Sequence, residues 1–116
     1  MLKIKRIYEP ADSADGYRIL VDRIWPRGVS KEAAAIDIWL KDVAPSTALR
    51  KWFGHDPARW SAFKRRYADE LSAAEAAAAV ERIRRAMEDR ATVTLLFSAR
   101  DEAHNQAVAL REYLSA

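Results

Sequence analysis

Two short apolar segments that lie far apart in the chain limit the folds open to this sequence. Tyr17 to Asp22 contains three consecutive aliphatic residues, and Thr92 to Phe97 is apolar and β-branched. Strands that are apolar throughout, rather than at every second position, are typical of parallel sheets covered on both faces. We therefore expect both segments to be buried strands, with neither at a solvent-exposed edge.

Weaker strand patterns and several helical patterns fill the rest of the chain. Leu2–Tyr8 mixes apolar and basic residues and is expected near a sheet edge, whereas Ile36–Leu40 alternates like a short strand. Helices are expected after Ser30, from Ser46 to Gly54, from Asp56 to Leu71, from Ala76 to Met87 and from Ala103 to Leu114.

The order of these elements predicts the fold class. Helices between strands, followed by a strand, a short loop and a closing helix, imply an α/β domain with parallel strands. The 116 residues suffice for one hydrophobic core. We expect a single compact domain over residues 1–116, with a mostly parallel sheet of about four strands flanked by helices.

Composition excludes several classes of protein. The chain has no cysteine, which excludes disulfides, thiolate nucleophiles and cysteine metal sites. Its apolar runs are too short to span a bilayer, and its first residues have no apolar segment of the signal-peptide kind. We therefore expect a cytoplasmic protein without a membrane partner.

The middle of the chain is basic and rich in tryptophan. Between Arg18 and Arg66 lie 11 of the 20 Lys and Arg residues, 5 of the 17 acidic residues and all four Trp. Guanidinium groups pair with phosphate or carboxylate, and indole rings stack on flat ligands. Trp52 and Trp60 fall on apolar helix faces, so we expect these two in the core.

Two polar loops follow the two apolar strands. One runs from Arg23 to Lys31 and contains Pro26 and Gly28, and the other runs from Ser98 to Asn105. In parallel α/β sheets, ligands bind beyond the carboxyl ends of the strands, often at helix N-termini. We therefore expect the two loops to meet and to form one pocket.

Four ordered motifs carry a family resemblance. They are Val-Asp-Arg-Ile-Trp-Pro-Arg-Gly at 21–28, Trp-Leu-Lys-Asp-Val-Ala-Pro-Ser at 39–46, Leu-Arg-Lys-Trp-Phe-Gly-His-Asp at 49–56, and His-Asn at 104–105. Over nearly its whole length the chain resembles domain-of-unknown-function family 488, in its small single-domain bacterial branch. The resemblance implies a compact α/β domain, and it implies fold rather than function.

One departure from the wider family bears on chemistry. The resemblance implies a Cys-His-Arg triplet in the last strand–helix loop of the wider family, where this chain has Ala103, His104 and Asn105. That departure excludes the cysteine-based chemistry that the wider family would suggest. An arginine three residues before a proline, as Arg23 stands before Pro26, also resembles the wider family.

The candidate ligand-binding residues can bind an anion or stack on a flat ring. They are Arg23, Trp25, Arg27, Lys31, Trp39, Ser98 and Asn105. For the arginines the alternative is pairing with Asp22 or Asp42, and for Trp25 it is packing in the core. Trp39 suits a core position and a cleft position equally.

The candidate catalytic residues are His104, Asp101 and His55. His104 is expected in the first turn of the closing helix, three residues after Asp101, which suits an acid–base pair. Asp101 suits the N-cap of that helix equally well, and His55 suits a plain turn. The two histidines show no metal-ligand spacing, so we expect neither a metal nor a cofactor.

Three functions remain open from the sequence. The leading hypothesis is a basic, Trp-lined pocket that binds an anionic ligand, phosphate-bearing or nucleotide-like, with acid/base catalysis as an option that leaves enzyme status undecided. The first alternative is a nucleic-acid-binding module that uses the basic surface of residues 18–66. The second is a domain that binds a protein partner. The sequence leaves the oligomeric state open.

Overall fold

The computed structural model describes all 116 residues and contains one four-stranded sheet. The strands are β1 (Leu2–Arg6), β2 (Tyr17–Leu20), β3 (Ile38–Trp39) and β4 (Val93–Phe97). Their order is β1-β4-β2-β3, and all three pairings are parallel. The expected α/β class with a mostly parallel sheet of about four strands is confirmed. The two apolar strands occupy the interior of the sheet.

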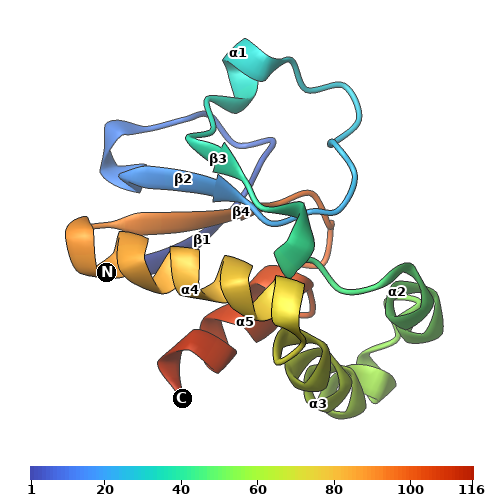
Figure 1. Cartoon of the computed structure of the whole chain (residues 1–116). Coiled ribbons are helices and arrows are strands. Elements are labelled where there is room, and N and C mark those ends of the chain that lie inside the picture. Colours follow the sequence, from blue (N-terminus) through green and yellow to red (C-terminus); the bar gives the residue numbers. More distant parts are fainter.

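Five helices and three short 3₁₀ turns complete the fold. The helices are α1 (Lys31–Ala34), α2 (Thr47–Phe53), α3 (Trp60–Leu71), α4 (Ala74–Asp89) and α5 (Gln106–Ser115). The turns cover Ser13–Asp15, Lys41–Val43 and Pro57–Arg59. Figure 1 shows α3, α4 and α5 on one side of the sheet and α1 on the other. It also shows α2 beyond the tips of the strand arrows.

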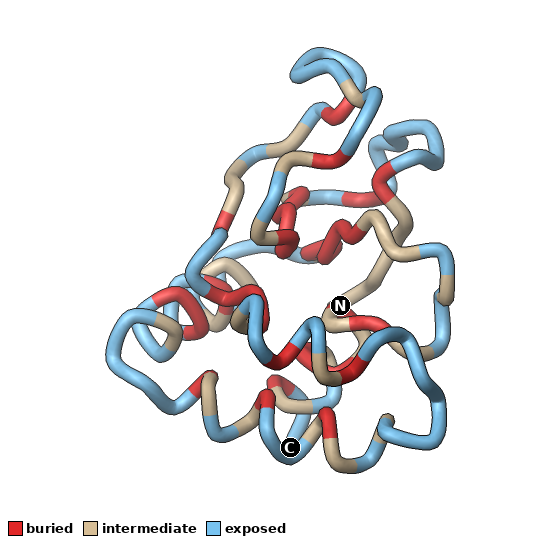
Figure 2. Tube along the Cα trace, turned by 90° about the vertical axis from the view of Figure 1, so that its right-hand side faces the viewer, coloured by how far each residue is buried: buried red, intermediate tan, exposed pale blue.

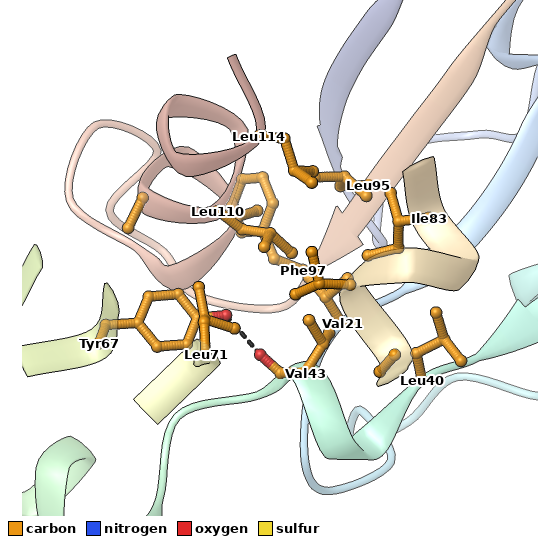
Figure 3. Packing of buried hydrophobic residues seen from close by; sticks show 14 of the residues in the cluster. Val21, Leu40, Val43, Tyr67, Leu71, Ile83, Leu95, Phe97, Leu110 and Leu114 are labelled. Atoms are coloured by element: carbon orange, nitrogen blue, oxygen red, sulfur yellow. Dashed lines mark hydrogen bonds between the residues drawn. The ribbon is translucent and has the colours of Figure 1, made fainter. Parts of the chain in front are cut away.

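The main hydrophobic core lies between the sheet and the three long helices. Val21, just after β2, and the alternate residues Leu95 and Phe97 of β4 point to this side and are almost fully buried. They meet Ile83 of α4 and Leu110 of α5 (Figure 3). This arrangement follows from the period-two alternation of strands and the amphipathic period of the helices. It leaves the strand tips free to present polar side chains.

The opposite face of the sheet has a smaller core. Leu20 and Leu96 are buried there together with Ile7 and Ala34. The loop after β2 and the short α1 cover this face, because Trp25, Val29, Ile36 and Trp39 pack against the cluster. Figure 2 places most of the buried chain in the middle of the molecule, with exposed loops at the top.

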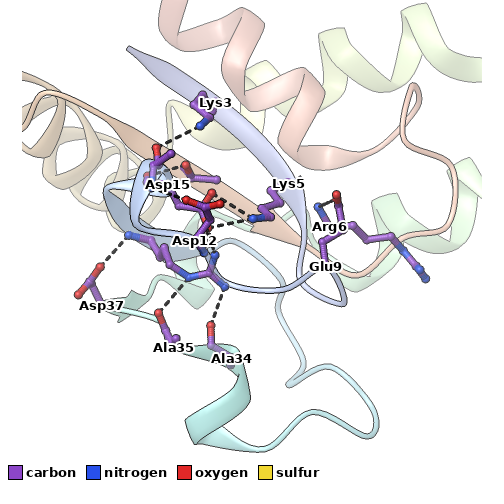
Figure 4. Close-up of polar contacts among 12 residues, drawn as sticks. Lys3, Lys5, Arg6, Glu9, Asp12, Asp15, Ala34, Ala35 and Asp37 are labelled. Carbon is purple, nitrogen blue, oxygen red and sulfur yellow. Dashed lines mark hydrogen bonds and ion pairs between the residues drawn. The ribbon is translucent and has the colours of Figure 1, made fainter.

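A buried ionic cluster completes the covered face near the start of β2 (Figure 4). Asp15 is 2% exposed, and its carboxylate accepts hydrogen bonds from Lys5 at 3.1 Å, from Arg18 and from the Asp12 N–H at 3.0 Å. Burial by itself would raise the pKa of Asp15, but these donors outweigh it and hold the pKa below its ordinary value. The Arg18 guanidinium also donates to the carbonyl oxygens of residues 34 and 35.

Two helix expectations need correction. The closing helix begins at Gln106 rather than Ala103, because the Asn105 side chain accepts from the Val108 N–H and caps the helix at that point. Trp52 and Trp60 are both half-buried at the edge of the core rather than inside it. The Arg66 guanidinium lies 4.0 Å from the Trp52 ring centroid.

Candidate functional site

A cavity of about 300 Å³ opens beyond the carboxyl ends of β2 and β4, and we call it the strand-end cavity. Its walls are residues 22–24, 44–45, 98–99 and 104–106, together with Thr47, Arg50, Lys51, Phe53, His55 and Phe63. Parallel strands end at one edge of a sheet, so the loops after β2 and β4 necessarily approach each other there. Segments of both expected loops line it, but only the first residues of the β2 loop take part.

Arg23 is the member of that loop that the structure fixes firmly. Its Nε donates to the Pro45 carbonyl at 3.2 Å and its Nη2 to the Ala44 carbonyl at 2.9 Å. Its Nη1 makes no hydrogen bond with the protein. The guanidinium is therefore held at the cavity wall with donors to spare, a preorganised arrangement for an anion.

Arg50 and Lys51 supply two further positive charges from α2. Both side chains are exposed and line the cavity. The helix that carries them is fixed at its start, because Ser46 caps the Leu49 N–H and is itself bound to Glu70 of α3 through its N–H and hydroxyl, at 2.8 and 2.6 Å. The cavity wall thus contains three permanent cations and one carboxyl group, that of Asp22.

Asp22 follows the buried end of β2 and is only 6% exposed. Its Oδ1 accepts from Gln106 Nε2 at 2.5 Å, whereas its buried Oδ2 has no hydrogen-bond partner. Burial raises the pKa of Asp22 above its ordinary value, and the opposing effects of Ser98, Gln106 and the Arg50 charge do not cancel that rise. Ser98 lies near this carboxyl group without forming a hydrogen bond to Oδ2.

His104 lies on the cavity wall just before the cap of α5. Its Nδ1 is 3.0 Å from Asp101 Oδ2, and Asp101 Oδ1 accepts the backbone N–H groups of Ala103 and His104 at 2.9 Å. A carboxylate only accepts hydrogen bonds, so we assign the proton to Nδ1, which leaves Nε2 free. Asp101 thus organises this loop instead of capping the helix.

His55 lines the same cavity from the turn after α2. It has a positive φ of 57°, as does Gly54 with 54°, so two successive residues are left-handed at the helix end. This conformation is unfavourable for a residue with a side chain. His55 and His104 thus line the same cavity, a point that the sequence left open.

The polar residues of the β4 loop are partly engaged in structure. Asn105 is buried, and its Nδ2 donates to the Asp101 carbonyl at 2.9 Å while its Oδ1 caps α5. The carbonyl oxygens of Ser98 and Ala99 accept from Arg6 Nε at 3.2 and 3.0 Å. Ser98 keeps its hydroxyl available, whereas Asn105 holds the loop in shape.

Four expected ligand-binding residues lie outside the cavity: Trp25, Arg27, Lys31 and Trp39. The indole N–H of Trp25 donates to Val29 O at 2.7 Å, that of Trp39 donates to Asp22 O at 2.6 Å, and the two rings pack edge to face. Both indoles cover the far side of the sheet, because the chain crosses to that side after Arg23. Arg27 and Lys31 are exposed there, and no tryptophan lines the cavity.

The basic stretch of residues 18–66 is divided among different parts of the molecule. Arg18 is buried with Asp15, Arg23 reaches the cavity, and Lys64 pairs with Glu112 at 3.1 Å. No group of three or more His, Cys, Asp or Glu side chains is placed to hold a metal ion. None of the helices has the length and apolar character needed to cross a membrane.

Comparison with known proteins agrees with the motifs. A family model described as "Inactive DUF488-N3 subclade" matches residues 1–116. The chain belongs to the DUF488 family. An uncharacterised protein of Mycobacterium tuberculosis H37Rv is 40% identical over 114 residues, which cover 98% of this chain and 93% of the relative. The uncharacterised protein YeaO of Escherichia coli K12 is 41% identical, with coverage of 97% and 96%. No solved structure matches significantly.

Sequence reasoning missed five polar residues of this DUF488 cavity: Asp22, Thr47, Arg50, Lys51 and Gln106. A signal for Asp22 was present, because an acidic residue directly after three aliphatic residues stands at a strand end. Arg50 and Lys51 gave no signal of their own, because the placement of α2 against the cavity depends on tertiary contacts with α3.

Proposed function

We propose that the strand-end cavity binds a small phosphate- or carboxylate-bearing molecule. The observation that carries this proposal is the convergence of Arg23, Arg50 and Lys51 on one cavity whose only carboxyl group is Asp22. Cations that meet in a concavity raise the local concentration of an anion and bind it more strongly than cations spread over a surface. Trp25 and Trp39, which the sequence analysis included among the ligand-binding residues, do not line this cavity.

The size of the cavity favours a small molecule over a polymer. A volume of about 300 Å³ stands at the lower end of ordinary ligand pockets and holds roughly ten water molecules. The basic residues outside it do not share one surface: Arg18 is buried with Asp15, whereas Arg27 and Lys31 are exposed in the segment that covers the far face of the sheet. A nucleic-acid-binding surface would need them on one face.

Binding without turnover is the form of this function that we propose. The chain has no cysteine, and its family model carries the description inactive. His104, oriented by Asp101, then serves as a ligand contact: Nε2 accepts a hydrogen bond when the ring is neutral and donates one when it is charged. Acid/base catalysis by His104 or His55 remains the alternative.

The test is a titration with n-propyl phosphate and with sulfate, followed through backbone amide shifts by nuclear magnetic resonance. We expect shifts at Ser98, at His104 and along α2. The Arg50→Ala/Lys51→Ala variant should lose most of the affinity because it removes two cations without touching the hydrogen bonds of Arg23.

The matched control is the Arg27→Ala/Lys31→Ala variant, which removes two exposed cations outside the cavity. It should keep the affinity of the parent protein. Absence of binding to both anions, or equal losses in the two double variants, would contradict the proposal.

A further inference from the structure

Asp22 Oδ2 is the one buried side-chain nitrogen or oxygen atom of the protein that has no hydrogen-bond partner. Asp15 is as deeply buried and accepts hydrogen bonds from Asp12, Lys5 and Arg18. Asp22 accepts one, from Gln106, through Oδ1. An unpaired buried acceptor costs about 1–3 kcal/mol, so it calls for a partner from outside the chain.

We infer that Asp22 Oδ2 accepts a hydrogen bond from a hydroxyl group of the bound ligand, so that the ligand is a small hydroxylated phosphate ester or hydroxy acid. This inference rests on the proposed function, because it concerns the same cavity. Asp22 lines the cavity next to Ser98 and Gln106, while Arg23, Arg50 and Lys51 supply its positive charge. The anionic group of the ligand binds to the cations, and its hydroxyl group binds to Asp22.

A hydroxyl donor fits this site better than an ammonium donor. An ammonium group would satisfy Asp22, but it would enter a cavity lined by three cations and one carboxyl group. A hydroxyl group carries no charge, and it can also accept a hydrogen bond from the nearby Ser98 hydroxyl. A site that leaves a buried polar group unpaired discriminates strongly against the ligand that lacks the matching donor.

The test compares two three-carbon phosphate esters, glycerol 3-phosphate and n-propyl phosphate, which differ in their hydroxyl groups. The readout is the ratio of their dissociation constants in the parent protein, in Asp22→Asn and in the control Asp42→Asn. In Asp22→Asn, the Gln106 amide holds the remaining side-chain oxygen, so an N–H₂ group takes the place of Oδ2 and presents a donor instead of an acceptor. The loss of the Asp22 carboxylate changes the affinity for both esters alike, so this effect cancels in the ratio of their dissociation constants.

We expect the parent protein and Asp42→Asn to bind glycerol 3-phosphate about tenfold or more tightly than n-propyl phosphate. In Asp22→Asn the ratio should fall to near one. Equal affinities in the parent protein, or a ratio that Asp22→Asn leaves intact, would show that water suffices for Oδ2 and would overturn the inference while the proposed function stands. If neither ester binds, both this inference and the proposed function fail.

Thermal unfolding of Asp22→Asn shows whether this variant folds. Asp22→Leu, which lacks any side-chain hydrogen bond, provides a second variant with the same expected ratio.

Discussion

The imidazole Nδ1 of His104 lies 3.0 Å from Asp101 Oδ2, and the imidazole and the Trp60 ring pack in a T-shaped arrangement with centroids 5.3 Å apart. One side of the ring is thus oriented by a carboxylate and another is packed against an indole. The orientation of Nε2 depends on both contacts.

Replacing Asp101 by Asn should loosen this loop and change how its stability depends on pH. Backbone hydrogen bonds from Ala103 and His104, together with the His104 side chain, hold the pKa of Asp101 below its ordinary value. Its contribution to folding is therefore present above the unfolded pKa and lost as the pH falls through the folded pKa. Urea unfolding at several pH values should show the variant losing less stability on acidification than the parent protein. An equal or greater loss in the variant would contradict this.

Replacing Asp15 by Asn should strongly destabilise the fold. Arg18 would remain 4% exposed without its carboxylate partner, and breaking a buried ion pair typically costs about 3–5 kcal/mol. Chemical denaturation measures the change. Asp12→Asn is the control, because Asn also caps the turn that Asp12 caps; similar losses in the two variants would show that the turn, rather than the buried ion pair, is responsible.

Replacing His55 by Gly should separate stability from binding. Its left-handed φ of 57° suits glycine, so the free energy of unfolding should stay constant or rise by up to about 1 kcal/mol. The affinity for n-propyl phosphate should fall because the cavity loses a side chain. Ala35→Gly removes the other non-glycine residue with a positive φ, 46° at the end of α1, and it should leave binding unchanged. Retained affinity in His55→Gly would make His55 a plain turn residue.

The raised pKa of Asp22 predicts a pH dependence of the opposite sign to that of Asp101. The folded protein holds this proton more tightly than the unfolded chain, so the stabilisation is present below the unfolded pKa and is lost as the pH rises through the folded pKa. The stability of Asp22→Asn relative to the parent protein should therefore increase with pH across that range. If the stability of Asp22→Asn relative to the parent protein instead decreased as the pH rises, Asp22 would be ionised and fully hydrogen-bonded in the folded protein.

Nucleic-acid binding has its own test. We expect no salt-dependent binding of DNA or RNA, because Lys64 pairs with Glu112 and Arg66 lies over Trp52. Fluorescence anisotropy in dilute buffer measures this directly. Affinity that falls steeply with salt and disappears in the Lys64→Glu/Arg65→Glu/Arg66→Glu variant would instead support the nucleic-acid module.

Local patterns predicted the fold well because they depend on few contacts. Ser46 and Gly54 mark the two ends of α2. The Ser46 side chain caps the first turn, and Gly54 adopts the left-handed conformation that ends the helix. The apolar runs became β2 and β4 because only an interior strand buries both faces. The start of α5 was misplaced because Asp101 and Asn105 are both good capping residues, and sequence does not say which one the loop geometry selects.

The site was harder to predict because it depends on which side of the sheet each loop covers. Trp25 and Arg23 are two residues apart, yet one packs on the far core and the other reaches the cavity. The composition of the loop after β2 led us to expect both residues in the site. The unpaired oxygen of Asp22 is a property of three-dimensional contacts, and no spacing of residues in the chain encodes it.

The strand order has a consequence for the way the chain is made. β1 pairs only with β4, so residues 2–6 have no strand partner until residues 93–97 have been synthesised. The Arg6 bonds to residues 98 and 99 form later still. The nascent chain therefore carries an unpaired strand while residues 7–92 are made, and the cavity cannot assemble before translation has passed the loop after β4.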